Sequence, residues 1–150
     1  MGIIVDVDLS AFTIRLLEPD DASVLDQVAP EVFDNVVDER WTAEFFNDPR
    51  HHLAVALDGE QVVGMASALH YVHPDKPPEL YISEIGLAPT YRNQGIGREL
   101  LKVLFAHGRA LGCAEAWLGT ERTNMAARRM YAAVGGEEED EDTVIVWFNL

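Results

Sequence analysis

A basic residue followed by two closely spaced glycines, the pattern Arg-x-x-Gly-x-Gly, occupies Arg92–Gly97. Glycines that open a helix let backbone N–H groups approach an anion, and the helix N-terminus adds roughly half a positive charge directed at it. Strand-forming residues precede this stretch, and an amphipathic helix is predicted to follow it to Leu111. The stretch predicts a cradle for a diphosphate, and a strand-to-helix turn without a ligand is the alternative.

Other glycine-containing motifs are missing from the sequence. Neither the dinucleotide pattern G-x-G-x-x-G nor the nucleoside-triphosphate loop G-x-x-x-x-G-K-[ST] is present. The nucleophile motif G-x-S-x-G of α/β-hydrolases is also missing. The histidines lack the spacing of a closed metal site, so we expect structural or solvent-exposed roles for them and no metal. These residues are His51, His52, His70, His73 and His107.

The glycine stretch needs a strand before it and a helix after it, and the chain supplies both within an α+β pattern. Asp58-Gly59 between two alternating apolar runs indicates a hairpin, and the next strand should make three consecutive antiparallel strands. The helix after the glycines places Ile96, Leu100, Leu101, Leu104 and Leu111 on one apolar stripe. The expected strands are 12–17, 52–57, 61–72, 80–88, 114–118 and 143–150, and the expected helices are 19–28, 41–47, 95–111 and 124–134.

The length and composition of the chain indicate its domain number and the kind of core it can form. A chain of 150 residues with 48% hydrophobic content has the size of one domain, which we expect to span residues 1–150 and to bury a core without metals or disulfides. The only cysteine, Cys113, lacks a neighbouring His or Cys and is expected to be a structural thiol. Acidic residues near the N-terminus stand where a secretion signal would carry basic ones, so a cytoplasmic protein is expected.

Charge is distributed unevenly. The formal net charge is −15, which argues against nucleic acid and against an anionic membrane as partners. Between Arg92 and Arg129, seven basic residues face three acidic ones, so this segment carries +4 and the rest of the chain −19. That division suits a polyanionic cofactor on one side and a cationic substrate on the other, although an acidic surface can also serve only solubility.

The order of motifs resembles a known superfamily. A strand, Arg-x-x-Gly-x-Gly, a helix, a short strand, and then Asn124 followed seven residues later by Tyr131 resembles the GCN5-related N-acetyltransferase (GNAT) superfamily over nearly the whole chain. Residues 62 to 97 look most like the type I aminoglycoside 3-N-acetyltransferases. The resemblance implies a central, mostly antiparallel, twisted sheet of six to seven strands flanked by about four helices.

The same resemblance implies acetyl-CoA as the cosubstrate, without a metal. Backbone N–H groups of the glycine loop would bind the pyrophosphate, and Arg92 would add charge. The pantetheine arm would add to the strand edge at Ile85–Leu87, where Gly86 has no side chain in the way; a bulge or packing glycine is the alternative. The N–H of Leu87 would polarise the thioester carbonyl. The implied cofactor residues are Ile85, Gly86, Leu87, Arg92, Asn93, Gln94, Gly95, Ile96, Gly97, Arg98 and Asn124.

Three further residues carry the chemistry that the resemblance implies. Tyr131 falls where the family places the general acid that protonates the departing thiolate, with core packing as the alternative. Glu84, which we expect to share a face with Ile82 and Gly86, is the candidate base or anchor for the substrate ammonium, and an edge-strand charge or an ion pair is the alternative. Asp34 lies in the loop that borders the acceptor cleft in the family. Acidic side chains at Asp38, Glu39 and 137–142 would either lie near that cleft or form solvated turns.

The sequence therefore predicts an enzyme that transfers acetyl from acetyl-CoA directly to a primary amine of a cationic small molecule. The most specific acceptor indicated is the 3-amino group of an aminoglycoside antibiotic, which would make the protein a resistance enzyme. A polyamine, amino acid or protein amine is the first alternative, and a non-catalytic acyl-CoA sensor the second. The apolar strand Val144–Phe148 could pair across a homodimer interface.

Overall fold

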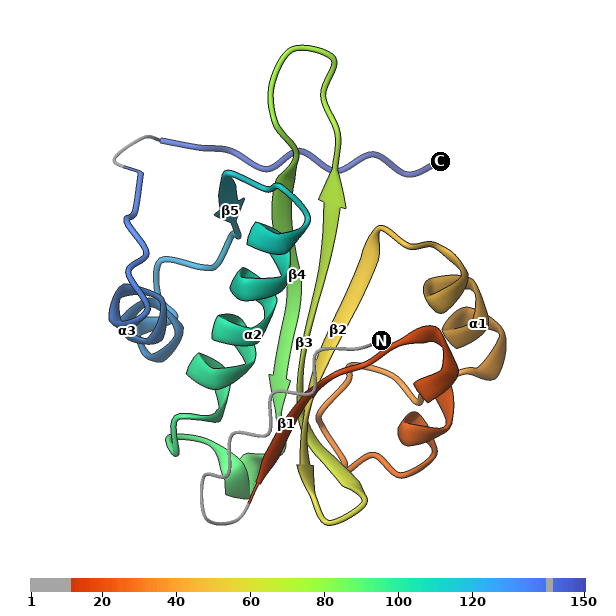
Figure 1. The fold of residues 1–150 in the computed structure, drawn as a ribbon. Helices are drawn as coiled ribbons and strands as arrows, with labels where there is room; N and C mark the ends of the chain where they lie inside the picture. The colour runs from red at the N-terminus through yellow and green to blue at the C-terminus, as the bar shows by residue number, and fades with distance from the viewer. Residues whose placement is uncertain (1–11, 140–141) are drawn as a thin grey trace.

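The computed structural model describes residues 12–139 and 142–150. One mixed sheet lies at its centre, with its strands in the order β1-β2-β3-β4-β5 (Figure 1). Neighbouring strands pair antiparallel from β1 to β4, and only β4 and β5 are parallel. The strands are β1 (Thr13–Leu16), β2 (His51–Asp58), β3 (Gln61–Tyr71), β4 (Glu79–Leu87) and β5 (Glu115–Trp117).

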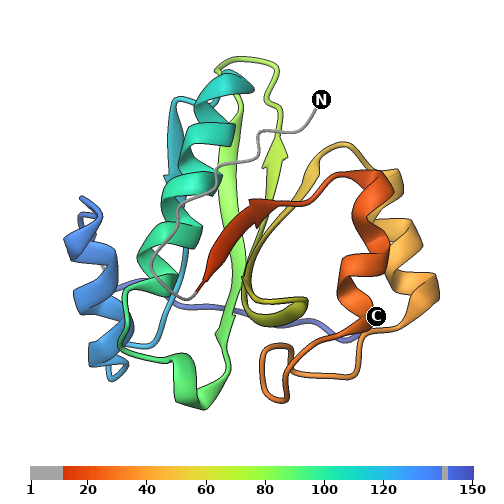
Figure 2. The same cartoon turned by 60° about the horizontal axis from the view of Figure 1, so that its bottom comes forward.

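Helical segments cover both faces of the sheet. The long helix α2 packs across one face, with α3 beside it, whereas η1 and α1 lie on the other side (Figures 1 and 2). Two of these segments, η1 and η2, are 3-10 helices. The helical elements are η1 (Pro19–Asp26), α1 (Glu39–Asn47), η2 (Pro89–Tyr91), α2 (Ile96–Ala110) and α3 (Met125–Ala133).

The core lies between the sheet and α2. Strands β2 and β3 are buried over most of their length because helical segments cover both of their faces. On α2, the predicted apolar stripe is confirmed for Ile96, Leu100, Leu101 and Leu104, all fully buried. Each such side chain contributes about 1.5–3 kcal/mol by leaving water. Leu111 is 37% exposed because it caps the end of the helix instead of continuing the stripe.

Two elements differ from expectation. The predicted helix 19–28 is the shorter 3-10 helix η1, which begins with a capping box between Glu18 and Asp21. The predicted strand 143–150 is wrong, because residues 142–150 belong to no strand of the described sheet. Trp147 and Phe148 are 87% and 80% exposed. Consecutive β-branched and aromatic residues favour an extended chain, but a strand also requires an edge with which it pairs.

No helix within residues 12–139 and 142–150 is long and apolar enough to cross a membrane.

Candidate active site

The central feature of the site is the edge of β4 that has no strand partner. β4 pairs with β5 only over Glu79–Tyr81, and residues 82–87 continue with no strand partner on that side among the described residues. Ala88 donates its N–H to the Val63 oxygen on β3 at 2.9 Å. Because successive backbone groups alternate in direction along a strand, the N–H and C=O of Leu87 point to the free edge. The end of β4 therefore presents a free backbone edge, with the Leu87 N–H directed away from β3.

Arg92 lies at the same edge. Its Nε donates a hydrogen bond to the Leu87 oxygen at 3.3 Å, so the guanidinium group is held beside the last residue of β4. Arg92 follows η2 directly, in the connection from β4 to α2, so its positive charge belongs to the same connection as the glycine motif.

The loop between η2 and α2 exposes backbone donors. Asn93 and Gly95 both adopt left-handed conformations, with φ of 61° and 83°, and Gln94 Nε2 donates to the Thr90 oxygen at 2.9 Å. No side chain caps α2, and the first backbone bond into the helix is from Glu99 N to Gly95 O at 3.3 Å. The N–H groups of residues 96–98 therefore have no acceptor within the helix, which is the condition under which a helix N-terminus can bind an anion.

Positions 95 and 97 are occupied by glycine for different structural reasons. Gly95 caps α2 with positive φ, and a Cβ there would face open space. At Gly97, in contrast, a Cβ would lie 2.4 Å from the Met130 sulfur. Gly97 therefore lets α3 pack closely against the first turn of α2, which the sequence motif alone did not show.

That packing brings α3 to the end of β4, since a Cβ on Gly97 would also lie 3.9 Å from Leu87 Cδ1. Tyr131, the residue after Met130, is half-buried and packs against the core. Burial raises the pKa of its hydroxyl above the ordinary value. The group stays protonated at neutral pH, as a proton donor must be.

Asn124 has a structural role, the capping of α3, that the sequence did not indicate. Its Oδ1 caps α3 by accepting the N–H of Ala127 at 3.2 Å. The side-chain NH₂ group is not used by this cap and remains a potential donor.

Gly86 is a packing glycine. A Cβ on this residue would lie only 1.9 Å from the carbonyl oxygen of Val32, so the loop after η1 crosses β4 in backbone contact at this point. The missing side chain therefore faces the loop, not the free edge. Cofactor addition to β4 involves its backbone edge and does not explain why residue 86 is glycine.

A β-bulge places Glu84. Ser67 on β3 pairs with Glu84, whereas the next residue, Ala68, pairs with Ile82, so Ser83 is the extra residue. The expectation that Glu84 shares a face with Ile82 is therefore wrong, because Ile82 is buried on the α2 side. Glu84 does share its face with Gly86, as expected, and its side chain is exposed.

Two serines fix the bulge. The Ser67 and Ser83 hydroxyls lie 2.8 Å apart, and the Ser83 hydroxyl also donates to the Ser67 backbone oxygen at 3.2 Å. Sequence reasoning missed both serines. The only available signal was Ser83 itself, a small polar residue inside an apolar strand.

The other acidic residues considered for the acceptor side differ in whether the structure already gives them a partner. Asp34 is exposed in the loop that follows the Val32 crossing. Asp38 caps α1 by accepting the N–H groups of Arg40 and Trp41 at 2.9 and 3.1 Å, so it has a structural duty. In the acidic run, Glu138 pairs with Arg128 at 2.7 Å, and residues 140 and 141 lie outside the described residues.

The histidines form a structural cluster. His52 Nε2 lies 2.7 Å from His70 Nδ1, and His52 Nδ1 lies 3.0 Å from His107 Nε2, which joins β2, β3 and α2. Burial, with the neighbouring histidines second, lowers the pKa of His52 to about 3. Both ring nitrogens of His52 are occupied by other imidazoles. Across residues 12–139 and 142–150, no group of His, Cys, Asp and Glu could hold a metal ion.

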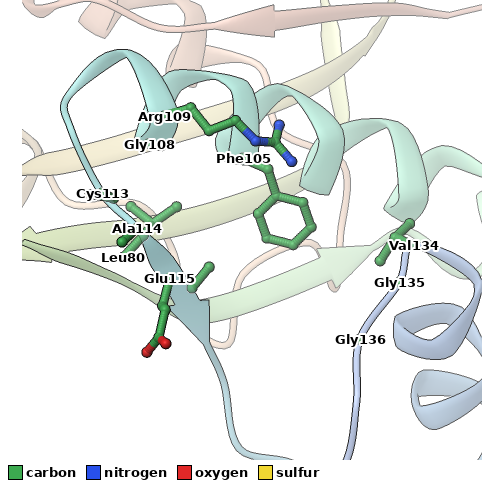
Figure 3. A pocket seen from close by; sticks show the side chains of 11 residues that line it. Leu80, Phe105, Gly108, Arg109, Cys113, Ala114, Glu115, Val134, Gly135 and Gly136 are labelled. Carbon is green, nitrogen blue, oxygen red and sulfur yellow. The ribbon is translucent and has the colours of Figure 1, made fainter.

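A cavity of about 230 Å³ lies elsewhere, between the last turns of α2, strand β5 and the end of α3 (Figure 3). Leu80, Phe105 and Val134 supply apolar walls, and Arg109 and Glu115 stand at its rim. Cys113 also lines it, and burial raises the pKa of this thiol, as expected for an unreactive cysteine. None of the predicted catalytic or cofactor residues lines this cavity.

The site combines a free strand edge with a helix N-terminus that no side chain caps, an arrangement suited to a ligand that carries both amides and phosphates. The chain belongs to the Acetyltransferase (GNAT) family, whose profile matches residues 17–135. It is accordingly an N-acetyltransferase that uses acetyl-CoA.

Proteins that are similar in sequence support this assignment. The chain is 31% identical over 134 residues to the N-alpha-acetyltransferase RimI of Mycobacterium tuberculosis, covering 85% of this chain and 80% of that protein. It is also 31% identical over 112 residues to an uncharacterised N-acetyltransferase of the same organism, covering 72% and 69%.

Solved structures show the same fold. The aminoglycoside acetyltransferase meta-AAC0020, from an uncultured soil metagenomic sample and in complex with trehalose, superposes with a TM-score of 0.82 at 19% identity, over 95% of this chain and 98% of that one. AAC(6')-Iy in complex with a CoA-containing bisubstrate analogue superposes with a TM-score of 0.74 at 20% identity, over 93% and 98%. The predicted GNAT fold is confirmed, with five strands in the described sheet where six to seven were expected.

Proposed function

We propose that this enzyme acetylates a primary amine of a cationic small molecule, and that the acceptor is an aminoglycoside, with its 3-amino group as the first position to test. The observation that carries this proposal is the exposed carboxylate of Glu84, which stands on an open sheet face one residue before the free edge of Ile85–Leu87. An ammonium group bound at Glu84 would lie close to an acyl group held at that edge. The excess negative charge outside residues 92–129 favours a polycationic acceptor.

In this proposal the cosubstrate binds along one continuous surface. The pyrophosphate binds at the first turn of α2, to N–H groups of Ile96, Gly97 and Arg98 that have no acceptor within the helix, and to the charge of Arg92. The Asn93–Gly95 turn provides the close approach, and the β4 backbone at Ile85–Leu87 pairs with the pantetheine amides. Asn124, at the start of α3, donates its side-chain NH₂ group to the same arm.

The chemistry then needs three groups of this chain. Glu84 takes a proton from the substrate ammonium, directly or through water, so that the neutral amine attacks the thioester carbon. The Leu87 N–H donates to the carbonyl oxygen as negative charge develops on it. When the C–S bond breaks, Tyr131 gives its proton to the thiolate leaving group. The nitrogen carries a surplus proton once the C–N bond has formed, and it releases this proton to water, from which the Tyr131 phenolate is reprotonated. Asp34 contributes negative charge to the acceptor side.

A protein or peptide amine is the second candidate acceptor, because the relative RimI is an N-alpha-acetyltransferase. A thiol-release assay with acetyl-CoA separates the candidates when it is run with aminoglycosides, linear polyamines, amino acids and peptides in parallel. Turnover on aminoglycosides with the highest kcat/KM supports the proposal. Preferred turnover of peptides, or no release with any aminoglycoside, overturns the acceptor assignment. Binding of acetyl-CoA without thiol release on any amine would instead indicate a sensor.

We further propose that the chain forms a homodimer in which Val144–Phe148 of one copy adds to β5 of the other. This segment is an exposed, unbroken run of β-branched and aromatic residues, the types that are enriched in strands. β5 is the edge strand of the described sheet, and the cavity of Figure 3 lies beside it, between α2 and the end of α3. Gel filtration with light scattering tests the pairing: the full chain should elute as a dimer and a chain ending at Thr143 as a monomer. A monomeric full chain contradicts it.

A further inference from the structure

The face of the sheet that carries Glu84 also carries an aromatic pair. Directly opposite residues of an antiparallel pair share a face, and β3 and β4 pair Ser67 with Glu84 and Leu69 with Tyr81. The bulge at Ser83 is the reason that two residues three positions apart, Tyr81 and Glu84, lie on one face. Trp117 of β5 pairs with Tyr81, and the two ring centroids lie 4.5 Å apart at 39°.

Hydrogen bonds hold this pair in place. Trp117 Nε1 donates to the Tyr71 hydroxyl at 2.5 Å, and that hydroxyl donates to Glu79 Oε2 at 2.6 Å. Lys76 pairs with the other oxygen of Glu79 at 2.9 Å. Trp117 is nevertheless 51% exposed. An indole that is fixed in orientation but left open to solvent loses little conformational entropy when a ligand covers it.

The position of the pair defines what it could bind. Tyr81–Trp117 is the last pair between β4 and β5, so it stands where the free edge of β4 begins. Glu84 follows about 7 Å further along the sheet, at about 3.3 Å per residue, because the partners of Glu84 and Tyr81 on β3, Ser67 and Leu69, are two residues apart. Aromatic ring faces carry negative potential and attract C–H edges and cations. Carboxylates on the same face, at Glu84 and Glu115, favour positive charge on the ligand.

We propose that Tyr81 and Trp117 form a stacking ledge for one aminated sugar ring of the acceptor, which directs the amine of a neighbouring ring to Glu84. This inference rests on the proposed acceptor class and deepens it. A linear polyamine offers no ring face to the ledge, and so the ledge selects ring-bearing amines over linear ones. The pair therefore acts on specificity through binding, while Glu84 and Tyr131 act on the chemistry.

The test is a calorimetric titration of CoA-loaded protein with sisomicin, and separately with spermine as a linear amine. Trp117→Leu should weaken sisomicin binding about 5- to 30-fold, as expected for loss of stacking and cation–π contacts. Trp117→Phe should stay within about threefold of wild type because a ring is retained. Spermine binding should change by less than about twofold in both variants.

Three results overturn the ledge: equal sisomicin affinity in wild type and Trp117→Leu, equal weakening of sisomicin and spermine, or no sisomicin binding by the wild type. If Trp117→Leu does not fold, Tyr81→Ala is read in the same way, with the urea midpoint as the folding control. Thiol release separates this proposal from the proposed function. If sisomicin binding depends on Trp117 but no acetyl group is transferred, the proposed function is wrong and the ledge stands. If acetyl transfer to sisomicin proceeds equally well in both variants, the ledge is wrong and the proposed function stands.

Discussion

Replacing His52 with glutamine should remove a large part of the acid sensitivity of this fold. In the folded protein His52 is buried among His70 and His107, and its pKa is lowered to about 3 from an ordinary value of 6.5. The unfolded chain therefore binds more protons than the folded one below pH 6.5, and stability falls as pH falls. At pH 5 the difference is about 1.5 pH units, or about 2 kcal/mol at 1.36 kcal/mol per unit.

Urea unfolding followed by tryptophan fluorescence at pH 7.5 and pH 5.0 measures this difference. Wild type should lose about 2 kcal/mol more than His52→Gln over that interval, because the carboxylates contribute equally to both proteins. The half-buried neighbour His51, which contacts Asp48 and lies outside the His52–His70–His107 cluster, provides a matched His→Gln control for the substitution itself. Parallel pH profiles for wild type and His52→Gln would refute the reasoning about the buried imidazole.

The remaining predictions concern the site. Gly86→Ala should destabilise the fold by about 1–3 kcal/mol or more in urea unfolding, since its Cβ would meet the Val32 oxygen; a midpoint like that of wild type would show that the loop yields freely. Gly95→Leu should cost about 1–2 kcal/mol of stability from its positive φ and raise the acetyl-CoA Kd by calorimetry, and unchanged affinity would remove the loop from the pyrophosphate site. Tyr131→Phe should lower kcat by about 10²- to 10⁴-fold with acetyl-CoA binding retained, and full-rate turnover would exclude the proton-donor role.

Much of the fold followed from local pattern. The hairpin at Asp58-Gly59, the three antiparallel strands and the buried stripe of α2 were all predictable, because turn residues and apolar periodicity act over a few residues. The failures are features that depend on contacts distant in sequence. Whether Val144–Phe148 pairs depends on a partner edge, and no local pattern specifies one.

The candidate site shows the same limit. The helix N-terminus after Arg92 was predictable from the glycine pattern, and the free edge of β4 was implied by the family resemblance. The bulge at Ser83 was not, so the face of Ile82 was assigned wrongly; a single inserted residue reverses the alternation of a strand and leaves little trace in composition. The reason for Gly86 was also hidden, because the Val32 oxygen comes from a loop more than fifty residues away in sequence.

The central claim is that Glu84 prepares the acceptor amine beside the free edge of β4. Steady-state kinetics of Glu84→Gln against wild type, with an acetyl-CoA thiol-release assay and an aminoglycoside acceptor, tests it most directly. The account predicts a fall in kcat of about 10²-fold or more, while the acetyl-CoA Kd stays at the wild-type value. Turnover at the wild-type rate in Glu84→Gln, with mass spectrometry showing the same acetylated product, would contradict it.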